Sequence, residues 1–181
     1  PTMADALARE HPRARVQVVP FVDHELFAQL GHEQARSEGP ASSREGASFF
    51  YPAELVGHKN HETLVQAWIL LRQRGCTARL QLTLRPEELQ ALERACPQLT
   101  SLGTVVNLGR LSRSQVLETM RASAGLLFAS RTETFGLPLL EAAAHHVPVL
   151  AAERDFVPDV CEPAQTFDPP SPRSLARGVQ R

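Results

Sequence analysis

The amino-acid sequence predicts a doubly wound α/β fold, a Rossmann-like parallel sheet with helices on both faces. Strand-like and helix-like segments alternate repeatedly along the chain. The strand segments are apolar throughout, which is typical of a sheet that is covered on both sides. With 181 residues, of which 43% are hydrophobic, the chain is long enough for one domain with a core of its own.

The N-terminal part contains two expected elements and a loop. Residues 3–10 favour a short helix, and the apolar run VQVVPF at 16–21 favours a strand. Residues 31–46 are polar, rich in glycine and serine, and include a proline. Because this composition is typical of loops and linkers, we expect a flexible loop at 31–46.

The regular alternation begins after this loop. The run SFFYPA at 48–53 predicts a buried strand, and the segment 60–74 has apolar residues at helical spacing behind Asn60, a preferred N-cap residue. ARLQLTL at 78–84 alternates like a strand. The segment 86–95 is expected to be a helix because proline is well tolerated in a first turn.

The alternation continues to the end of the chain. TVVNLG at 104–109 predicts a strand, and Ser112 with Gln115 resembles a capping box that opens a helix to about Ser123. GLLFAS at 125–130 is a continuous apolar strand. The remaining expected elements are a helix from near Pro138 to about His145, strands at 147–152 and 165–168, and a short helix capped by Ser171.

Composition excludes several classes of protein. The net charge of −1 gives no sign of a nucleic-acid-binding protein. Three widely spaced cysteines form no disulfide framework or CxxC pair, which favours a reduced, cytoplasmic compartment. No apolar run approaches the ~18 residues of a membrane span, and we expect no signal peptide. Of the 19 basic residues, 18 are arginine and one is Lys59.

Two glutamates flank the turn between the strand at 125–130 and the next helix. Ligands of open parallel sheets bind outside the carboxyl ends of the strands. Gly136 lets backbone approach a ligand, and the unpaired N–H groups of a first helical turn bind anions. Glu133 and Glu141 could accept hydrogen bonds from hydroxyl groups. Together these groups suit a sugar that is attached to a diphosphate.

Each glutamate also has a simpler explanation. Glu133 is equally explained by a favourable interaction with the helix dipole, which needs no ligand. Glu141 is harder to explain in this way. It lies in an apolar segment, LLEAAA, and a buried carboxylate without a partner is costly.

The stretch ETFGLPLLEA resembles the E-x7-E motif of retaining glycosyltransferases of the GT-B fold, specifically family 4, the glycosyl transferases group 1. The resemblance implies that Glu133 and the backbone of Phe135, Gly136 and Leu137 contact the donor sugar and phosphate. It also implies that Glu141 holds the ribose hydroxyls. The following PVLAAERDFV…TFDPPSP is similar to the segment after the motif in that family.

A second segment, FFYPAELVGHKNHETLVQAW, resembles the family's strand–G-R-L…K-G–helix stretch. Lys59 is at the position of the lysine that binds the donor diphosphate, so the resemblance assigns it to the catalytic site together with the first glutamate of the motif. The family's arginine position is occupied by Pro52 or Ala53. His58 and Arg110 are the candidates to replace that charge.

A third segment, VVNLGRLSRSQVLETMRAS, resembles the family less specifically. The resemblance places its turn at 107–110, with Gly109, near the nucleotide base. In all, the resemblance covers about residues 46–179. It implies half of a GT-B fold, in which 1–22 are the tail of an N-terminal domain with the hinge and 23–181 are the C-terminal nucleotide-sugar-binding domain.

The resemblance also implies the activity of the intact enzyme. It would transfer a hexose, with retention, from a UDP-, GDP- or ADP-sugar to a glycan or lipid-linked acceptor held by the N-terminal domain. No metal or other cofactor is expected, and peripheral membrane association of the intact enzyme is compatible with this reading. The fragment alone is expected to be nearly inactive, because half a cleft cannot position both reactants.

Two other functions remain open from the sequence. One is a GT-B-type nucleotide-sugar epimerase or phosphorylase, and donor hydrolysis without transfer would favour the epimerase. The other is a non-catalytic nucleotide-sugar-binding module, which would bind its ligand tightly without a second domain.

Overall fold

The computed structural model describes residues 3–17 and 46–181, and the chain divides into two compact units, 1–38 and 39–181. In the first unit, α1 (Met3–Glu10) confirms the predicted N-terminal helix. Val16 and Gln17 belong to no regular element, and the rest of the strand expected at 16–21 lies outside the described residues. The loop expected at 31–46 lies outside them too, except for its last residue.

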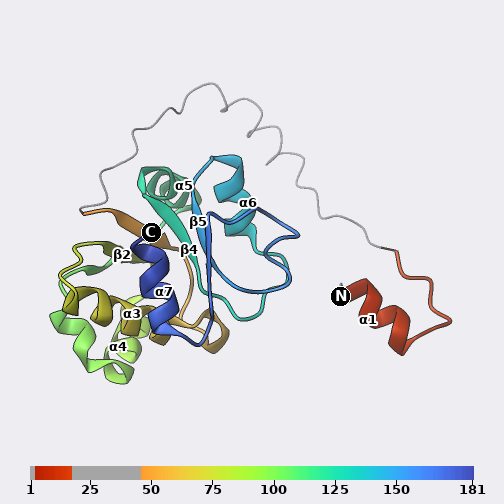
Figure 1. Ribbon diagram of the computed structural model, residues 1–181, viewed down its shortest axis with the longest axis horizontal. Coiled ribbons are helices and arrows are strands. Elements are labelled where there is room, and N and C mark those ends of the chain that lie inside the picture. The colour runs from red at the N-terminus through yellow and green to blue at the C-terminus, as the bar shows by residue number, and fades with distance from the viewer. Residues whose placement is uncertain (1–2, 18–45) are drawn as a thin grey trace. The chain divides into compact units, whose positions relative to one another are not determined.

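The second unit contains a six-stranded, all-parallel sheet with the strand order β3-β2-β1-β4-β5-β6 (Figure 1). This order confirms the predicted doubly wound fold. The first strand, β1, lies at the centre of the sheet, and β2 and β3 follow it to one edge. The chain then returns to the centre, where β4 pairs with β1, and β5 and β6 follow to the other edge. The strands are β1 (Ser48–Tyr51), β2 (Arg79–Leu82), β3 (Val105–Asn107), β4 (Gly125–Phe128), β5 (Val149–Ala152) and β6 (Gln165–Phe167).

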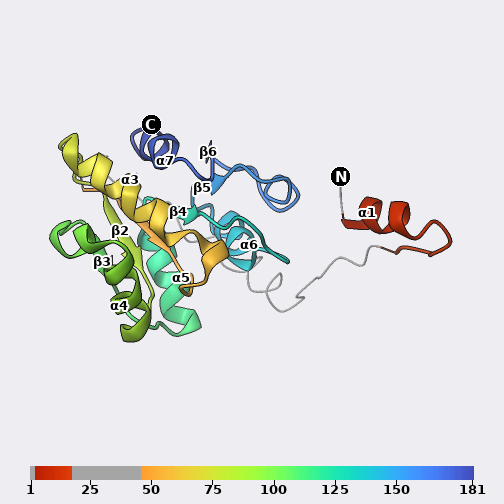
Figure 2. The ribbon, with the colours of Figure 1, turned by 90° about the horizontal axis from the view of Figure 1, so that it is seen from below.

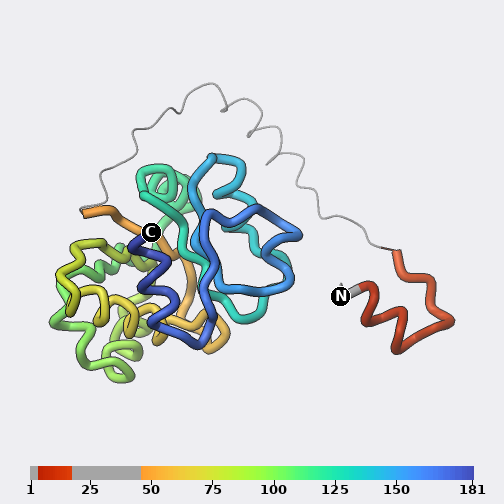
Figure 3. The backbone as a smooth tube through the Cα atoms, in the orientation of Figure 1, coloured from red at the N-terminus to blue at the C-terminus, as the bar shows by residue number. Residues whose placement is uncertain are grey.

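The helices lie where the sequence predicted them, within a residue or two. They are α3 (His61–Gln73), α4 (Pro86–Ala95), α5 (Arg113–Ala122), α6 (Leu137–Ala144) and α7 (Pro172–Val179). Two short 3-10 turns, η1 (Gly57–Lys59) and η2 (Pro97–Ser101), were not predicted. The tube in Figure 3 follows this path from the orange strand β1 to the blue helix α7.

Several strands are shorter than their apolar runs. The strand expected at 48–53 ends at Tyr51, because Pro52 has no N–H to donate to a neighbouring strand. The strand expected at 147–152 likewise begins only at Val149, directly after Pro148.

Two apolar layers cover the two faces of the sheet. One joins buried side chains of α3, α7 and α4 to the sheet, including Trp68, whose indole N–H donates to the carbonyl of Ala78 at 2.9 Å. The other joins α5 and α6 to the opposite face. Phe50 and Tyr51 are neighbours on β1 and enter different layers, as strand alternation requires. Figures 1 and 2 show α3 and α7 side by side.

Within residues 3–17 and 46–181, no helix is both long enough and apolar enough to cross a bilayer.

Candidate functional site

The central strands β1 and β4 are hydrogen-bonded neighbours, so the loops at their carboxyl ends lie next to each other. The loop after β1 carries Lys59 and the loop after β4 carries Glu133. The Lys59 ammonium donates to Glu133 Oε1 across 74 positions of sequence. Both side chains are mostly enclosed, with 22% and 13% of their surfaces exposed. The structure therefore brings the two residues predicted to be catalytic into an ion pair.

The turn that carries Lys59 is held by several further contacts. The Arg131 backbone N–H donates to the carbonyl of His58 at 2.8 Å, and the Arg131 guanidinium donates to Asn60 Oδ1 at 2.7 Å. The Tyr51 hydroxyl donates to the carbonyl of Lys59 at 2.6 Å. Burial raises the pKa of Tyr51, so this hydroxyl stays protonated and remains a donor.

Asn60 precedes α3 as expected, but its side chain does not cap the helix. Its backbone is left-handed, with φ of 61°, a conformation that asparagine tolerates better than most residues. Its amide donates to the carbonyl of Pro169 at 2.8 Å, and its Oδ1 accepts from the Thr63 hydroxyl at 2.7 Å. The prediction of a side-chain cap was wrong because the Thr63 hydroxyl, the Arg131 guanidinium and the carbonyl of Pro169 take the side chain instead.

The loop after β4 enters α6 through Gly136. This residue has φ of +76°, and a Cβ there would lie 3.2 Å from Leu139 Cδ1, so the turn requires glycine. The first helical bond is the Leu139 N–H to the carbonyl of Gly136 at 2.9 Å. The amides of Gly136 and Leu137 come before this bond, at the end of the helix where anions bind. Phe135 is half-buried, and Leu137 is 41% exposed.

Glu141 lies on the second turn of α6 and is only 7% exposed. Its partner is Arg113, the first residue of α5, whose Nη2 is 3.2 Å from Glu141 Oε1. Burial raises the pKa of Glu141, and the Arg113 guanidinium acts against that shift. Sequence reasoning missed Arg113. The available signal was a basic residue at a helix N-terminus, where the helix dipole disfavours positive charge unless an acid is close.

The other predicted site residues lie around these two pairs. Gly109, with φ of 71°, and the exposed Arg110 are in the loop after β3, which leads to Arg113. Strand β3 is separated from β1 by β2, and the segment after β3 reaches Glu141 through the side chain of Arg113. The side chain of His58 is exposed, and its turn is held through the main-chain carbonyl.

The space beside Lys59 is small. A hollow of 10 Å³ lies there between Tyr51, Ser130 and Pro138, about enough for one water. A pocket of 480 Å³ lies elsewhere, between α3 and α7, and its lining contains none of the predicted site residues. The hollow beside Lys59 is therefore too small to enclose a sugar or a diphosphate.

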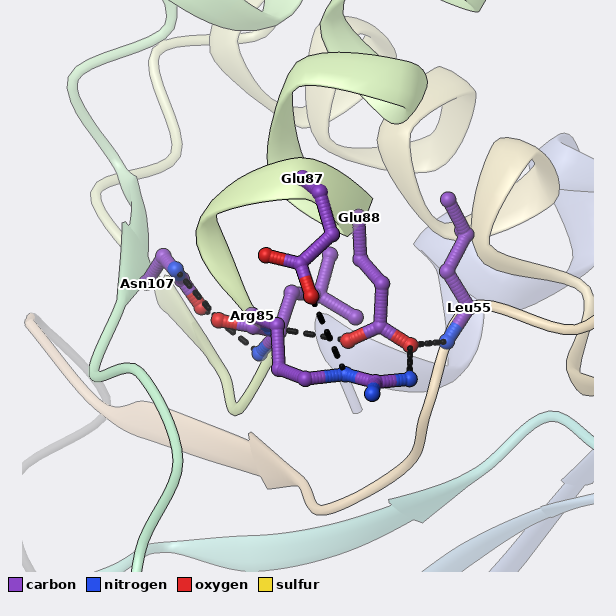
Figure 4. Close-up of polar contacts among 6 residues, drawn as sticks. Leu55, Arg85, Glu87, Glu88 and Asn107 are labelled. Atoms are coloured by element: carbon purple, nitrogen blue, oxygen red, sulfur yellow. Dashed lines mark hydrogen bonds and ion pairs between the residues drawn. The ribbon is translucent and has the colours of Figure 1, made fainter.

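A second polar group, the Glu88 cluster, lies at the same edge of the sheet (Figure 4). It consists of Leu55, Leu84, Arg85, Glu87, Glu88 and Asn107. The Glu88 carboxylate accepts from the Arg85 amide at 2.8 Å, from the Arg85 guanidinium at 3.2 Å and from the Leu55 amide at 3.2 Å. The Arg85 side chain and these amides lower the pKa of Glu88 to about 2, although burial opposes the shift. Asn107 bonds both backbone groups of Leu84, at 2.8 and 2.9 Å.

His61 lies between these two polar groups. It is the first residue of α3, is 3% exposed, and its ring centroid is 5.0 Å from that of Tyr51. Burial lowers the pKa of His61 to about 4. The Ala53 backbone and Glu88 oppose this shift, whereas Lys59 adds to it.

Comparison with known proteins identifies the family. The model of the family described as Glycosyl transferases group 1 matches residues 34–181. No curated protein matches the chain. Among solved structures, the isolated C-terminal domain of a glycosyl transferase group 1 family protein from Francisella tularensis superposes with a TM-score of 0.60 and 20% identity, over 78% of this chain and 82% of that domain.

Two longer proteins share the same fold. Sucrose-phosphate synthase from Thermosynechococcus elongatus gives a TM-score of 0.72 at 20% identity, over 98% of this chain and 46% of the synthase. HepE from Anabaena, solved in complex with UDP and glucose, gives 0.61 at 19% identity, over 87% of this chain and 42% of that protein. The present chain thus spans less than half of either protein. It belongs to the glycosyl transferases group 1 family, and its fold is that of the C-terminal domain of a GT-B enzyme.

Proposed function

We propose that this chain is the donor-binding domain of a retaining hexosyltransferase that uses a nucleoside-diphosphate sugar. The observation that carries the proposal is the Lys59–Glu133 ion pair, because it stands where the strand order reverses, between β1 and β4. Ligands of doubly wound sheets bind at this point. A lysine beside a carboxylate offers a cation for phosphate and an acceptor for sugar hydroxyls.

Donor binding would replace the ion pair between Lys59 and Glu133 with contacts from each residue to the donor. The Lys59 ammonium would leave Glu133 for the diphosphate and stabilise the leaving group, together with the amides at the start of α6. Glu133 would then accept from hydroxyls of the sugar, and Glu141 from those of the ribose. Charge-assisted hydrogen bonds of this kind are worth about 1.5–3 kcal/mol each. Phe135, Gly136 and Leu137 would approach the donor through their backbone.

The rest of the proposed enzyme follows from the family. We assign residues 23–181 to the donor domain and 1–22 to the end of an N-terminal domain with its hinge. The acceptor, a glycan or a lipid-linked glycan precursor, would be bound by that domain, and no metal is required by this scheme. The UDP and glucose bound by HepE support a nucleotide sugar as the donor. The base and the hexose are left to experiment.

Calorimetric titration of the chain with UDP, GDP, ADP and their hexose conjugates tests the proposal. Binding of one nucleotide series, lost in Lys59→Ala, would support a donor site at this place. Arg79→Ala is the matched control, because Arg79 is an exposed cation at the beginning of β2, the opposite end of the sheet. Equal binding by the wild-type chain and Lys59→Ala would contradict the assignment, as would no binding of any nucleotide at millimolar concentration.

A further inference from the structure

We propose that Arg131 and Asn60 are positioning residues that hold the Lys59–Glu133 pair in register. The importance of this positioning for binding rests on the proposed function, but the contacts of Arg131 and Asn60 are present whatever the ligand is. Neither residue belongs to the predicted set of site residues. Both are placed by contacts between the same two loops that carry the pair.

The two loops are joined by three contacts within a few residues. The Arg131 N–H donates to the carbonyl of His58, the Arg131 guanidinium donates to Asn60 Oδ1, and the Lys59 ammonium donates to Glu133. Residues 58–60 are thereby joined to residues 131–133 at successive points. The two contacts of Arg131 lie on either side of Lys59 in the sequence, so they fix the position of the lysine backbone against the opposite loop.

Asn60 is a firm support for the guanidinium. It is 4% exposed, and its side chain is held from three sides. Its Oδ1 accepts from both Thr63 and Arg131, while its Nδ2 donates to the carbonyl of Pro169. A side chain with these partners cannot turn without breaking several buried hydrogen bonds.

Arg131 acts here through geometry more than through charge. Its partner is the neutral amide oxygen of Asn60, not a carboxylate. From the sheet side, the Tyr51 hydroxyl holds the carbonyl of Lys59. The turn is therefore fixed between β1 and the loop after β4. Small misplacements of reacting groups have large effects on catalysis, which gives such a support its value.

The single lysine of the chain makes the proposal directly measurable. Protein labelled with [13C]lysine gives one side-chain ε-CH2 signal by NMR, and its chemical shift reports on the Lys59–Glu133 pair. Glu133→Gln supplies the reference signal for a broken pair. Arg131→Met removes the guanidinium but keeps the apolar stem and the backbone contact to His58.

Arg131→Met is expected to move the lysine signal at least half of the way to that of Glu133→Gln. Asn60→Gly, which tolerates the left-handed backbone, is expected to move it in the same direction. The double variant should move it no further than the larger single change, because each single variant already removes the Arg131–Asn60 contact. Arg79→Ala removes an exposed arginine elsewhere and should leave the signal in place. A wild-type lysine signal in folded Arg131→Met would overturn the proposal.

Titration of the same proteins with UDP, GDP and ADP separates this inference from the proposed function. If the nucleotide that binds the wild-type chain binds Arg131→Met roughly tenfold more weakly, because Lys59 is no longer held in position, both stand. If the lysine signal moves but no nucleotide binds even the wild-type chain, the positioning stands and the donor assignment fails. If nucleotide binds and the signal does not move, the donor assignment stands and the positioning fails.

Discussion

Two polar groups at the same edge of one sheet are built in different ways. In the Glu88 cluster the carboxylate mainly satisfies backbone donors. Glu88 accepts from the amide of Arg85, three positions earlier, and from the amide of Leu55, 33 positions earlier. Lys59 and Glu133 are 74 residues apart, and each charge is paired with the charge of another loop. The first arrangement stabilises the fold, whereas the second holds two charges where a ligand could replace either partner.

The largest expected effect is on ligand affinity. Lys59→Ala should weaken binding of the preferred nucleotide diphosphate by about a hundredfold, because a charged hydrogen bond to phosphate is lost. Calorimetry measures the affinity, and thermal melting measures the stability that is lost because Glu133 is left without its cation. A melting temperature lowered by many degrees at unchanged affinity would assign the Lys59–Glu133 pair to the same structural class as the Glu88 cluster.

His61, between the two groups, should make stability depend on pH. Its folded pKa of about 4 is below the ordinary value of 6.5. Between pH 6.5 and 4 His61 binds a proton in the unfolded chain but not in the folded chain. The free energy of unfolding therefore falls as the pH drops from 6.5 to 4, and it does not depend on His61 titration above pH 6.5. The loss is at most about 3 kcal/mol.

Urea unfolding between pH 4 and 7 measures this dependence, with His61→Phe as the comparison. The variant should lose most of the slope in this range. An unchanged slope would mean that His61 does not titrate differently in the folded and unfolded states.

Glu88→Gln tests the structural cluster. The pKa of Glu88 is lowered to about 2, so the carboxylate stabilises the fold above its ordinary pKa of 4.5, and this contribution disappears as the pH falls from 4.5 towards 2. At neutral pH the variant should lose about 1–2 kcal/mol of stability, since one oxygen acceptor is lost. Nucleotide affinity should stay within twofold of the wild type. A large loss of affinity would show that this cluster too belongs to the ligand site.

The smallest effect is expected at the rim of the site. Arg113→Ala should raise the pKa of Glu141 further, because burial then acts without an opposing cation. Nucleotide affinity should fall only a few-fold at neutral pH and should weaken more steeply on acidification, since a protonated Glu141 accepts less well from the ribose. Comparing the nucleotide that binds the wild-type chain with its 2′-deoxy form checks this assignment. An equal effect of Arg113→Ala on both ligands would place Glu141 away from the 2′-hydroxyl.

Periodicity and caps were enough to predict the order and type of the elements. Ser112 and Ser171 cap their helices as the sequence indicated, because a cap needs only residues a few positions away. The same reasoning wrongly predicted a side-chain cap at Asn60, since its side chain donates to the carbonyl of Pro169, 109 positions later.

The residues of the candidate site were predicted from family resemblance, but their contacts were not. No periodicity relates Lys59 to Glu133, because their contact depends on β1 and β4 pairing in the sheet. The Arg113–Glu141 pair likewise depends on how α5 packs beside α6. Strand order decides both contacts, and strand order is set by the whole chain.

The position of β1 beside β4 also has a consequence for synthesis. Lys59 leaves the ribosome 74 residues before Glu133, an interval of roughly 4 to 15 seconds at ordinary translation rates. During this interval the first three strands can pair, but the lysine has no opposite loop. A ligand bound at the proposed site would therefore bind only after the second half of the sheet has joined the first.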